Sequence, residues 1–232
     1  DTVELTLGAR WYDIEVDLEG SANAIAGTGF GGGDQQRFGT NLSGAFNAPG
    51  EVTGNPVLDA LDYPDKAVSD GVIGKATLAW NKSEDVMYYV TWSEGFRPGL
   101  LNRPAGAVST DGTYTVRPVT DSDEITNYEF GWKTVLRDGQ LRFNGAAFFV
   151  DISGLQTSIL DPAMGTNLFF SDNAADAEIS GVEGDFTYYT NTDGLVVSGA
   201  FSMLDSEIKK SLTTSDVVAG MPLAFAPEMQ GK

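Results

Sequence analysis

Hydrophobic and polar residues alternate with a period of two in several segments of the chain. In residues 3–12, every second residue from Val3 to Trp11 is apolar, and most of the residues between them are polar or small. The pattern recurs at residues 72–80, 86–92, 126–136, 141–149, 182–188 and 195–203. A two-residue period is typical of β-strands with one apolar face. No segment of comparable length shows a helical period, so the sequence predicts an all-β protein with about seven strands.

The predicted connections between these strands alternate in length. Short connections at residues 81–85, 137–139 and 191–194 separate long ones at about residues 18–70, 96–123, 158–176 and 211–222. Asp138-Gly139 and Asp193-Gly194 are strong hairpin signals, because glycine accepts the positive φ of such turns. In an antiparallel up-and-down meander, this alternation puts every long loop at one end, as in outer-membrane barrels. The sequence therefore favours part of a transmembrane β-barrel with long external loops.

Two other architectures are consistent with alternation alone. A soluble β-sandwich also has strands with one apolar face, and it predicts Greek-key pairing with Tyr128, Phe130 and Trp132 buried against a second sheet. A passive channel or a small complete barrel with a structural role is a further alternative. No run of about 18 to 20 apolar residues is present, so we expect no transmembrane helix.

The composition excludes several kinds of site. The 232 residues include no cysteine and no histidine, which excludes disulfides, thiolate chemistry and histidine-based catalysis or metal binding. Asp and Glu number 33 against 14 Lys and Arg, and the net charge of −19 argues against a nucleic-acid partner. Because 41% of the residues are hydrophobic, the chain is not a disordered acidic tail. We expect the acids in loops and around a water-filled lumen, with no enzymatic activity and no cofactor.

Two loop motifs have simpler interpretations than the sites they resemble. Gly27-Thr28-Gly29-Phe30-Gly31-Gly32 has the spacing of a dinucleotide-binding loop, but no helix is predicted after it, and we interpret it as an external loop. The acids within residues 121–124, and the group Asp59, Asp62 and Asp65, offer oxygen ligands for calcium. Neither group matches the spacing of a complete calcium loop, so we interpret both as solvated loop residues.

Several segments, in order along the chain, resemble the barrel of TonB-dependent outer-membrane receptors. They are Gly8-Ala9-Arg10-Trp11; Tyr88-Tyr89-Val90-Thr91-Trp92-Ser93-Glu94-Gly95-Phe96-Arg97-Pro98-Gly99 followed by Asn102-Arg103; Asn127-Tyr128-Glu129-Phe130-Gly131-Trp132-Lys133 followed by Asp138-Gly139; Asn173-Ala174-Ala175-Asp176-Ala177-Glu178-Ile179-Ser180-Gly181-Val182-Glu183; and Pro222-Leu223 with Ala226-Pro227-Glu228. Each segment alone is a weak signal, but their common order over most of the chain is specific.

The resemblance implies a 22-stranded barrel closed around a globular N-terminal plug, in the outer membrane of a Gram-negative bacterium. It also implies import of a scarce nutrient, such as a ferric siderophore or cobalamin, with energy passed by the TonB system through the plug. The implied partners are outer-membrane lipid, the TonB system and a small nutrient ligand. This sequence shows no plug, no TonB-contacting box and no terminal strand that ends in an aromatic residue. We therefore expect both ends to be cuts within a longer chain, and the segment to be an incomplete part of the barrel.

Candidate ligand-binding residues are expected in two places. The mouth and lumen candidates are Arg97, Asn102, Arg103, Glu129, Glu183 and Asp185. The first three follow a strand that runs into a long loop, and the last three alternate toward the polar side of their strands. Paired carboxylates on one face also occur in glycosidases, but no nucleophile or oriented base accompanies them here. Because the long loops are acidic, a neutral or cationic nutrient or a saccharide is as consistent with the sequence as an anionic siderophore.

Overall fold

The computed structural model describes residues 1–17, 66–102, 117–160, 169–213 and 217–232, which form a single antiparallel sheet. Its strands are β1 (Thr2–Asp17), β2 (Lys66–Ser83), β3 (Val86–Arg97), β4 (Asp123–Leu136), β5 (Leu141–Leu160), β6 (Phe169–Tyr189), β7 (Val196–Ser211) and β8 (Met229–Gly231). The strands lie side by side in chain order, which confirms the predicted all-β, up-and-down meander. None of the described residues belongs to a helix long and apolar enough to cross a membrane.

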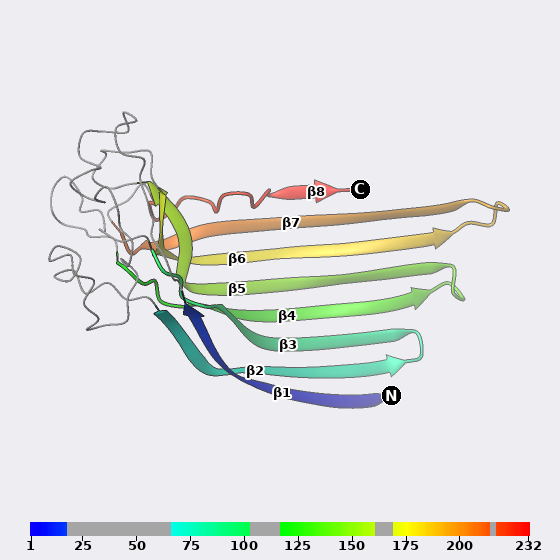
Figure 1. Ribbon diagram of the computed structural model, residues 1–232. Helices are drawn as coiled ribbons and strands as arrows, with labels where there is room; N and C mark the ends of the chain where they lie inside the picture. The colour runs from blue at the N-terminus through cyan, green and yellow to red at the C-terminus, as the bar shows by residue number, and fades with distance from the viewer. Residues whose placement is uncertain (18–65, 103–116, 161–168, 214–216) are drawn as a thin grey trace, which may run out of the picture.

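The connections of the two lengths lie at opposite ends of the sheet (Figure 1). Short turns at residues 84–85, 137–140 and 190–195 join β2 to β3, β4 to β5 and β6 to β7 at what we name the turn end. The longer connections leave from the opposite end, which we name the loop end. Positive φ angles of 90° at Gly139 and 76° at Gly194 confirm the two predicted Asp-Gly hairpin turns.

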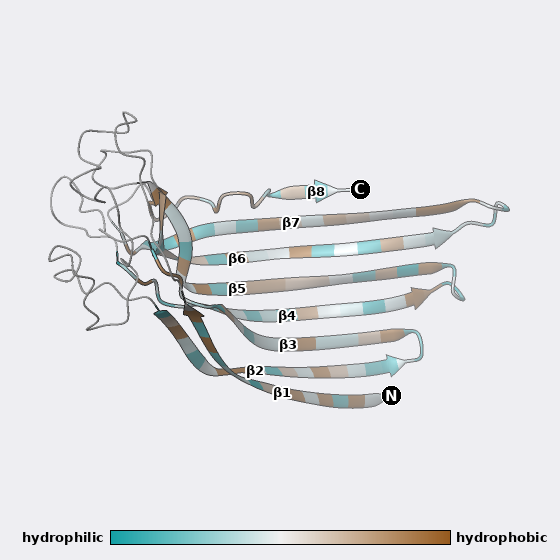
Figure 2. Ribbon diagram, viewed as in Figure 1, coloured by the Kyte–Doolittle hydropathy of each residue, from teal (hydrophilic) through white to brown (hydrophobic). Residues whose placement is uncertain are grey.

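One face of the sheet is apolar and exposed, and we name it the apolar face. The strand register places Trp80 opposite Tyr88, and Tyr88 opposite Trp132, so bulky rings of neighbouring strands share this face. Tyr128 and Phe130, on the same face, are 51% and 46% exposed. Figure 2 shows the resulting bands of hydrophobic and hydrophilic residues along the strands. The sandwich alternative is wrong, because the described residues form one sheet and these rings are not buried against another.

Glycines inside the strands make room for aromatic rings from adjacent strands. The Tyr89 ring lies over Gly131, and the Trp132 ring lies over Gly145, so closely that a methyl group on either glycine would overlap the ring. The same close approach occurs between Tyr12 and Gly71, Trp92 and Gly74, Phe148 and Gly181, Phe201 and Gly184, and Phe186 and Gly199. A ring over a glycine covers backbone that has no side chain of its own. These seven glycines are therefore packing positions.

The strands extend further toward the loop end than the sequence predicts. β5 and β6 occupy much of the predicted connection 158–176. The sequence does not show the extension of β5 because a bulge between Ile152 and Leu155 shifts the alternation there. β2 likewise begins within the predicted connection 18–70, at Lys66. An eighth strand, β8, has only three residues and is too short to show a period. The described residues thus form eight strands, where the sequence predicts about seven.

Candidate functional site

The face opposite the apolar face carries the predicted lumen residues, and we name it the polar face. The register aligns Lys133, Asn144 and Asp185 in one row across β4, β5 and β6. Glu183 lies in the next row toward the loop end, and Glu129 lies in the row after that. Because every second side chain of a strand points to the same side, all five residues project from one face. The alternation in the sequence predicted the polar side for each of the three carboxylates, and the register now gives their order along it.

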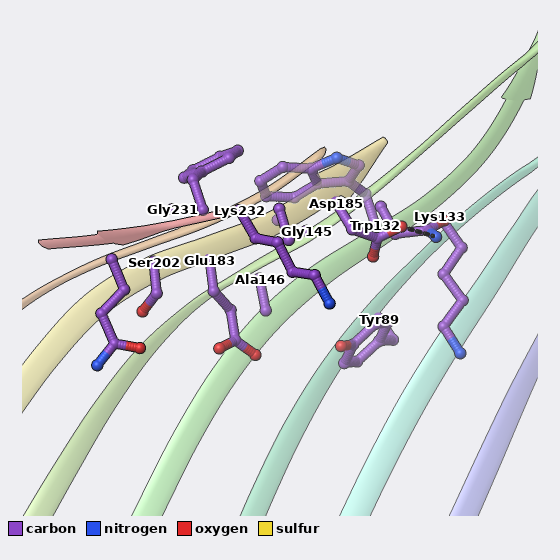
Figure 3. Close-up of a pocket in the computed structure, with 15 residues that line it drawn as sticks. Tyr89, Trp132, Lys133, Gly145, Ala146, Glu183, Asp185, Ser202, Gly231 and Lys232 are labelled. Atoms are coloured by element: carbon purple, nitrogen blue, oxygen red, sulfur yellow. Dashed lines mark hydrogen bonds between the residues drawn. The ribbon is translucent and has the colours of Figure 1, made fainter. Parts of the chain in front are cut away.

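A hollow of about 550 Å³ lies over the polar face between β4 and the end of the chain. Figure 3 shows Lys133, Glu183 and Lys232 extending on the same side of the sheet from three different segments. Asn144 Nδ2 donates a 3.2 Å hydrogen bond to the Asp185 carboxylate in the same wall. The volume is within the usual range for a small-molecule site. A wall with cations, carboxylates and an amide suits a polar ligand better than an apolar one.

Tyr89 links two rows of the polar face. Its hydroxyl donates a 2.6 Å hydrogen bond to Oε1 of Glu129 on the adjacent strand. In the same region the hydroxyl oxygens of Thr77 and Thr91 lie 3.0 Å apart, which joins β2 to β3 in the same way. Such cross-strand side-chain bonds restrict the rotamers of both partners. Glu129 therefore presents its carboxylate in a defined orientation.

Arg97 and Asp123 form an ion pair with a buried carboxylate where β3 and β4 reach the loop end. The Asp123 carboxylate is 0% exposed and accepts hydrogen bonds from the Arg97 backbone nitrogen at 3.0 Å and from Arg97 Nε at 2.7 Å. Arg97 Nη2 completes the ion pair and also donates a 3.0 Å bond to the Gln156 carbonyl oxygen on β5. The side chain of Arg97 is half exposed. Its charge is used mainly to hold three strands together at the predicted mouth.

Asn102 is also held inside the protein rather than presented to solvent. Its amide nitrogen donates to the carbonyl oxygens of Arg117 at 2.8 Å and Ser171 at 2.7 Å, and its side-chain oxygen accepts a 2.8 Å bond from the Ser171 nitrogen. Both amide hydrogens are therefore used internally. Arg103, the third mouth candidate, lies outside the described residues. The structure thus separates the predicted site residues into a group at the loop end and a group on the polar face.

Asp172 is a second buried carboxylate at the loop end, although the sequence placed it in a solvated loop. It lies in β6, on the loop side of the exposed apolar residues Val182, Phe186 and Tyr189. Burial raises the pKa of its carboxyl group, and a 2.9 Å hydrogen bond from the Asn173 backbone nitrogen acts in the opposite direction. Arg117 Nη2 lies 3.5 Å from the same carboxylate. Asp123 and Asp172 are therefore part of the folded loop end and not of a uniformly solvated mouth.

The calcium alternative finds no support among the described residues, where no group of three or more Asp or Glu side chains is arranged to hold a metal ion. In the 121–124 segment, Asp121 pairs with Arg117 at 2.6 Å. The interpretation of this segment as solvated was wrong for Asp123, which is fully buried. The other acidic group, at residues 59–65, and the glycine-rich loop at residues 27–32 lie outside the described residues.

Sequence reasoning missed Tyr89, Gln156 and Asn173. Gln156 and Asn173 are buried and bond to backbone segments far away in the chain, and nothing in their own neighbourhood marks that role. Tyr89 had a partial signal, because its segment and that of Gly131 are consecutive predicted strands, which pair side by side in a meander. A glycine opposite an aromatic residue in a predicted register indicates a ring that lies over the glycine.

Comparison with known proteins decides the family. A family model described as TonB dependent receptor-like, beta-barrel, matches residues 1–232, which is the entire chain. The chain belongs to this family of TonB-dependent receptor barrels. Proteins of the family are receptors and transporters of the Gram-negative outer membrane, not enzymes. No curated protein matches the chain.

Solved receptor structures share the fold of this TonB-dependent receptor barrel. The ferric-catecholate import receptor Fiu from E. coli is 19% identical, with a TM-score of 0.57 over 98% of this chain and 28% of Fiu. The ferric yersiniabactin uptake receptor FyuA from Yersinia pestis is 19% identical, with a TM-score of 0.51 over 72% of this chain and 23% of FyuA. The copper transporter OprC is 14% identical, with a TM-score of 0.53 over 76% of this chain and 24% of OprC. The chain thus spans about a quarter of the length of these proteins.

Proposed function

We propose that the chain forms one arc of a 22-stranded barrel, closed around a plug, that imports a scarce nutrient across the outer membrane. The observation that carries the proposal is a single sheet with one exposed apolar face, one polar face and all long connections at one end. Among the described residues, β1 pairs only with β2, and β8 only with β7. An edge strand in lipid needs a partner for its backbone groups, which further strands of a closed barrel supply.

In this arrangement the apolar face contacts outer-membrane lipid and the polar face lines the water-filled lumen. We assign ligand contact in the lumen to Glu129, Glu183 and Asp185, which project from one wall into or beside the hollow. Arg97 and Asn102 stabilise the structure of the mouth, because their polar atoms are bonded to the surrounding backbone. Arg103 follows them in the chain and is assigned to the same mouth.

The cargo is a ferric siderophore, cobalamin or a similar scarce nutrient, and energy comes from TonB through the plug. Support comes from the family and from relatives whose names describe ferric-catecholate, ferric yersiniabactin and copper transport. The net charge of −19 affects which of these ligands the receptor attracts. An acidic mouth attracts a cationic metal species and repels an anionic chelate, and added salt weakens both effects.

The test uses the full-length receptor in a Gram-negative host without its own siderophore and cobalamin receptors. The probes are radiolabelled iron(III) catecholate, cyanocobalamin and copper(II), each supplied at low and high ionic strength. We expect receptor-dependent uptake of one probe that is lost when TonB is deleted. Equal uptake with and without TonB would support the alternative of a passive channel. Uptake of the anionic iron(III) catecholate that weakens as salt is added would contradict a repulsive mouth.

A further inference from the structure

We propose that the two ends of the β3–β4 connection form a rigid lip at the mouth of the barrel, which three buried carboxamides hold in place. The lip consists of residues 98–102 and 117–122, and the carboxamides are those of Asn102, Gln156 and Asn173. The effect of the lip on uptake rests on the proposed import function, whereas its rigidity can be tested independently of any cargo.

The two halves of the lip pair with each other as a short antiparallel ladder. Leu101 lies opposite Val119 in an isolated β-bridge. The Asn102 nitrogen donates to the Pro118 carbonyl oxygen at 2.8 Å, and the Thr120 nitrogen donates to the Leu100 carbonyl oxygen at 2.9 Å. The Leu100 nitrogen in turn donates to the Thr120 hydroxyl at 2.8 Å, and Thr120 is almost fully buried. The two ends of the β3–β4 connection are therefore hydrogen-bonded to each other where they leave the sheet.

The Gln156 side chain on β5 bonds to both halves of the lip. Its amide nitrogen donates 2.9 Å hydrogen bonds to the carbonyl oxygens of Pro98 and Asp121. The backbone of the same residue is bonded to Arg97 and Asp123, so the lip is connected to this ion pair as well. Asn102 repeats this arrangement from the lip toward β6, through its bonds with Ser171.

Asn173 on β6 holds the second half of the lip. Its amide nitrogen donates to the carbonyl oxygens of Asp121 at 2.9 Å and Gly154 at 2.7 Å. Its side-chain oxygen accepts bonds from the Asp121 nitrogen and from Arg117 Nη2, both at 2.8 Å. The amide thus uses both donors and both acceptor positions within the protein.

These contacts favour one position of the lip over all others. Asn102, Gln156 and Asn173 are 5%, 8% and 7% exposed, so none of them can exchange its partners for bulk water without a larger opening. A displaced lip would leave several buried donors and acceptors unpaired at once, which is strongly unfavourable. The lip therefore stays closed while cargo passes. Gln156 and Asn173 are positioning residues, because they act on cargo through the placement of the lip.

Hydrogen exchange of the full-length receptor tests the rigidity of the lip. We compare Gln156→Ala and Asn173→Ala with Gln140→Ala, which removes an exposed amide bond to Asn191 at the turn end. Either lip variant should speed exchange at the Asp121 and Thr120 nitrogens by about tenfold or more, because local opening becomes easier. The control should leave those sites unchanged. Unaltered exchange in Gln156→Ala would overturn the proposal, even if Asn173→Ala failed to assemble.

A disulfide across the lip tests whether it must open. Leu101 and Val119 form a non-hydrogen-bonded antiparallel pair, whose Cα atoms typically lie about 4.5 Å apart and can be bridged. The 232 residues contain no cysteine that would compete. The double variant Leu101→Cys with Val119→Cys should import the iron(III) catecholate, cyanocobalamin or copper(II) probe equally well oxidised and reduced. Loss of uptake on oxidation that a reductant restores, and that single-cysteine variants lack, would overturn the proposal.

Uptake kinetics separate positioning from a merely structural role. Gln156→Ala should raise the KM for the transported probe and leave the maximal rate unchanged, because the import machinery remains intact. A fall in maximal rate with an unchanged KM would contradict the positioning role. If the unaltered receptor shows no TonB-dependent uptake of any of the three probes, the proposed function fails, and the exchange experiment still decides the rigidity of the lip.

Discussion

The aromatic ring of Tyr89 covers Gly131 on the adjacent strand, and no side chain larger than a hydrogen atom fits beneath it. The ring is kept there by the 2.6 Å hydrogen bond from its hydroxyl to Glu129. Gly131 thereby fixes the orientation of two polar groups on the face that we assign to the lumen. This relationship makes a glycine within a strand a determinant of the candidate site.

Gly131→Ala should destabilise the receptor by about 1–3 kcal/mol, because the added methyl group displaces the Tyr89 ring. Gly95→Ala is the matched control on β3, since a methyl group at Gly95 meets open space. Urea unfolding of the purified receptor in lipid vesicles, followed by tryptophan fluorescence, measures the difference. Equal unfolding midpoints for the two variants would show that the ring moves aside at no cost.

Asp123→Asn should destabilise the loop end of the sheet by about 2 kcal/mol, because charged hydrogen bonds to Arg97 are lost from a buried site. Arg97 is half exposed and can regain water, which keeps the loss below that of a fully buried pair. Asp121→Asn provides the control, since the Asp121 carboxylate is 78% exposed and its pair with Arg117 should contribute less than about 1 kcal/mol. Limited proteolysis and unfolding midpoints report both variants. A larger effect at Asp121 would reverse the assignment of the two acids.

Two neighbouring residues of β7 test which face meets lipid. Met203 projects from the apolar face and is 45% exposed, whereas Ser202 projects from the polar face beside the hollow. Met203→Arg should weaken membrane insertion by about 2–4 kcal/mol if it lies near the bilayer midplane, and less toward the interface. Ser202→Arg should insert normally. The amount of folded, heat-modifiable receptor in the outer membrane measures insertion, and equal yields of both variants would contradict the assignment of the faces.

The sequence alone predicted seven of the eight described strands and the side of the sheet that their residues face, because a two-residue period is a local property. It placed Glu129, Glu183 and Asp185 on the polar side and found both Asp-Gly turns from neighbouring residues alone. Where a bulge interrupts the period, as in β5, the strand boundary was lost.

The loop end could not be predicted in the same way, because its structure depends on contacts between distant segments. Asp123 lies among polar residues that resemble a solvated loop, yet the fold buries it against Arg97 and Gln156. Asn173 bonds to Asp121, 52 positions away in the chain. No pattern within either segment predicts its contact with the other, so the lip can be recognised only in the three-dimensional structure.

Lys209 on β7 lies between two carboxylates that face each other across the sheet. Its Nζ atom lies 3.0 Å from Glu207 and 3.4 Å from Glu178, which are opposite residues in the register. The site is on the loop side of Met203, the last exposed apolar residue of the strand. The hydrogen bond to Glu207 and the charge of Glu178 raise the pKa of Lys209 above its ordinary value of 10.5. The ammonium form is therefore favoured in the folded state.

Because the folded pKa is higher than the unfolded one, this contribution to stability is fully present below pH 10.5 and is lost as the pH rises through the raised pKa. Lys209→Met should lower the unfolding midpoint modestly at neutral pH, since two like charges then face each other without a cation. The difference from the unaltered receptor should shrink at alkaline pH. Lys210→Met serves as the control on the same strand. Midpoints measured from neutral to strongly alkaline pH decide the matter, and a difference that stayed constant throughout would exclude Lys209 as the titrating group.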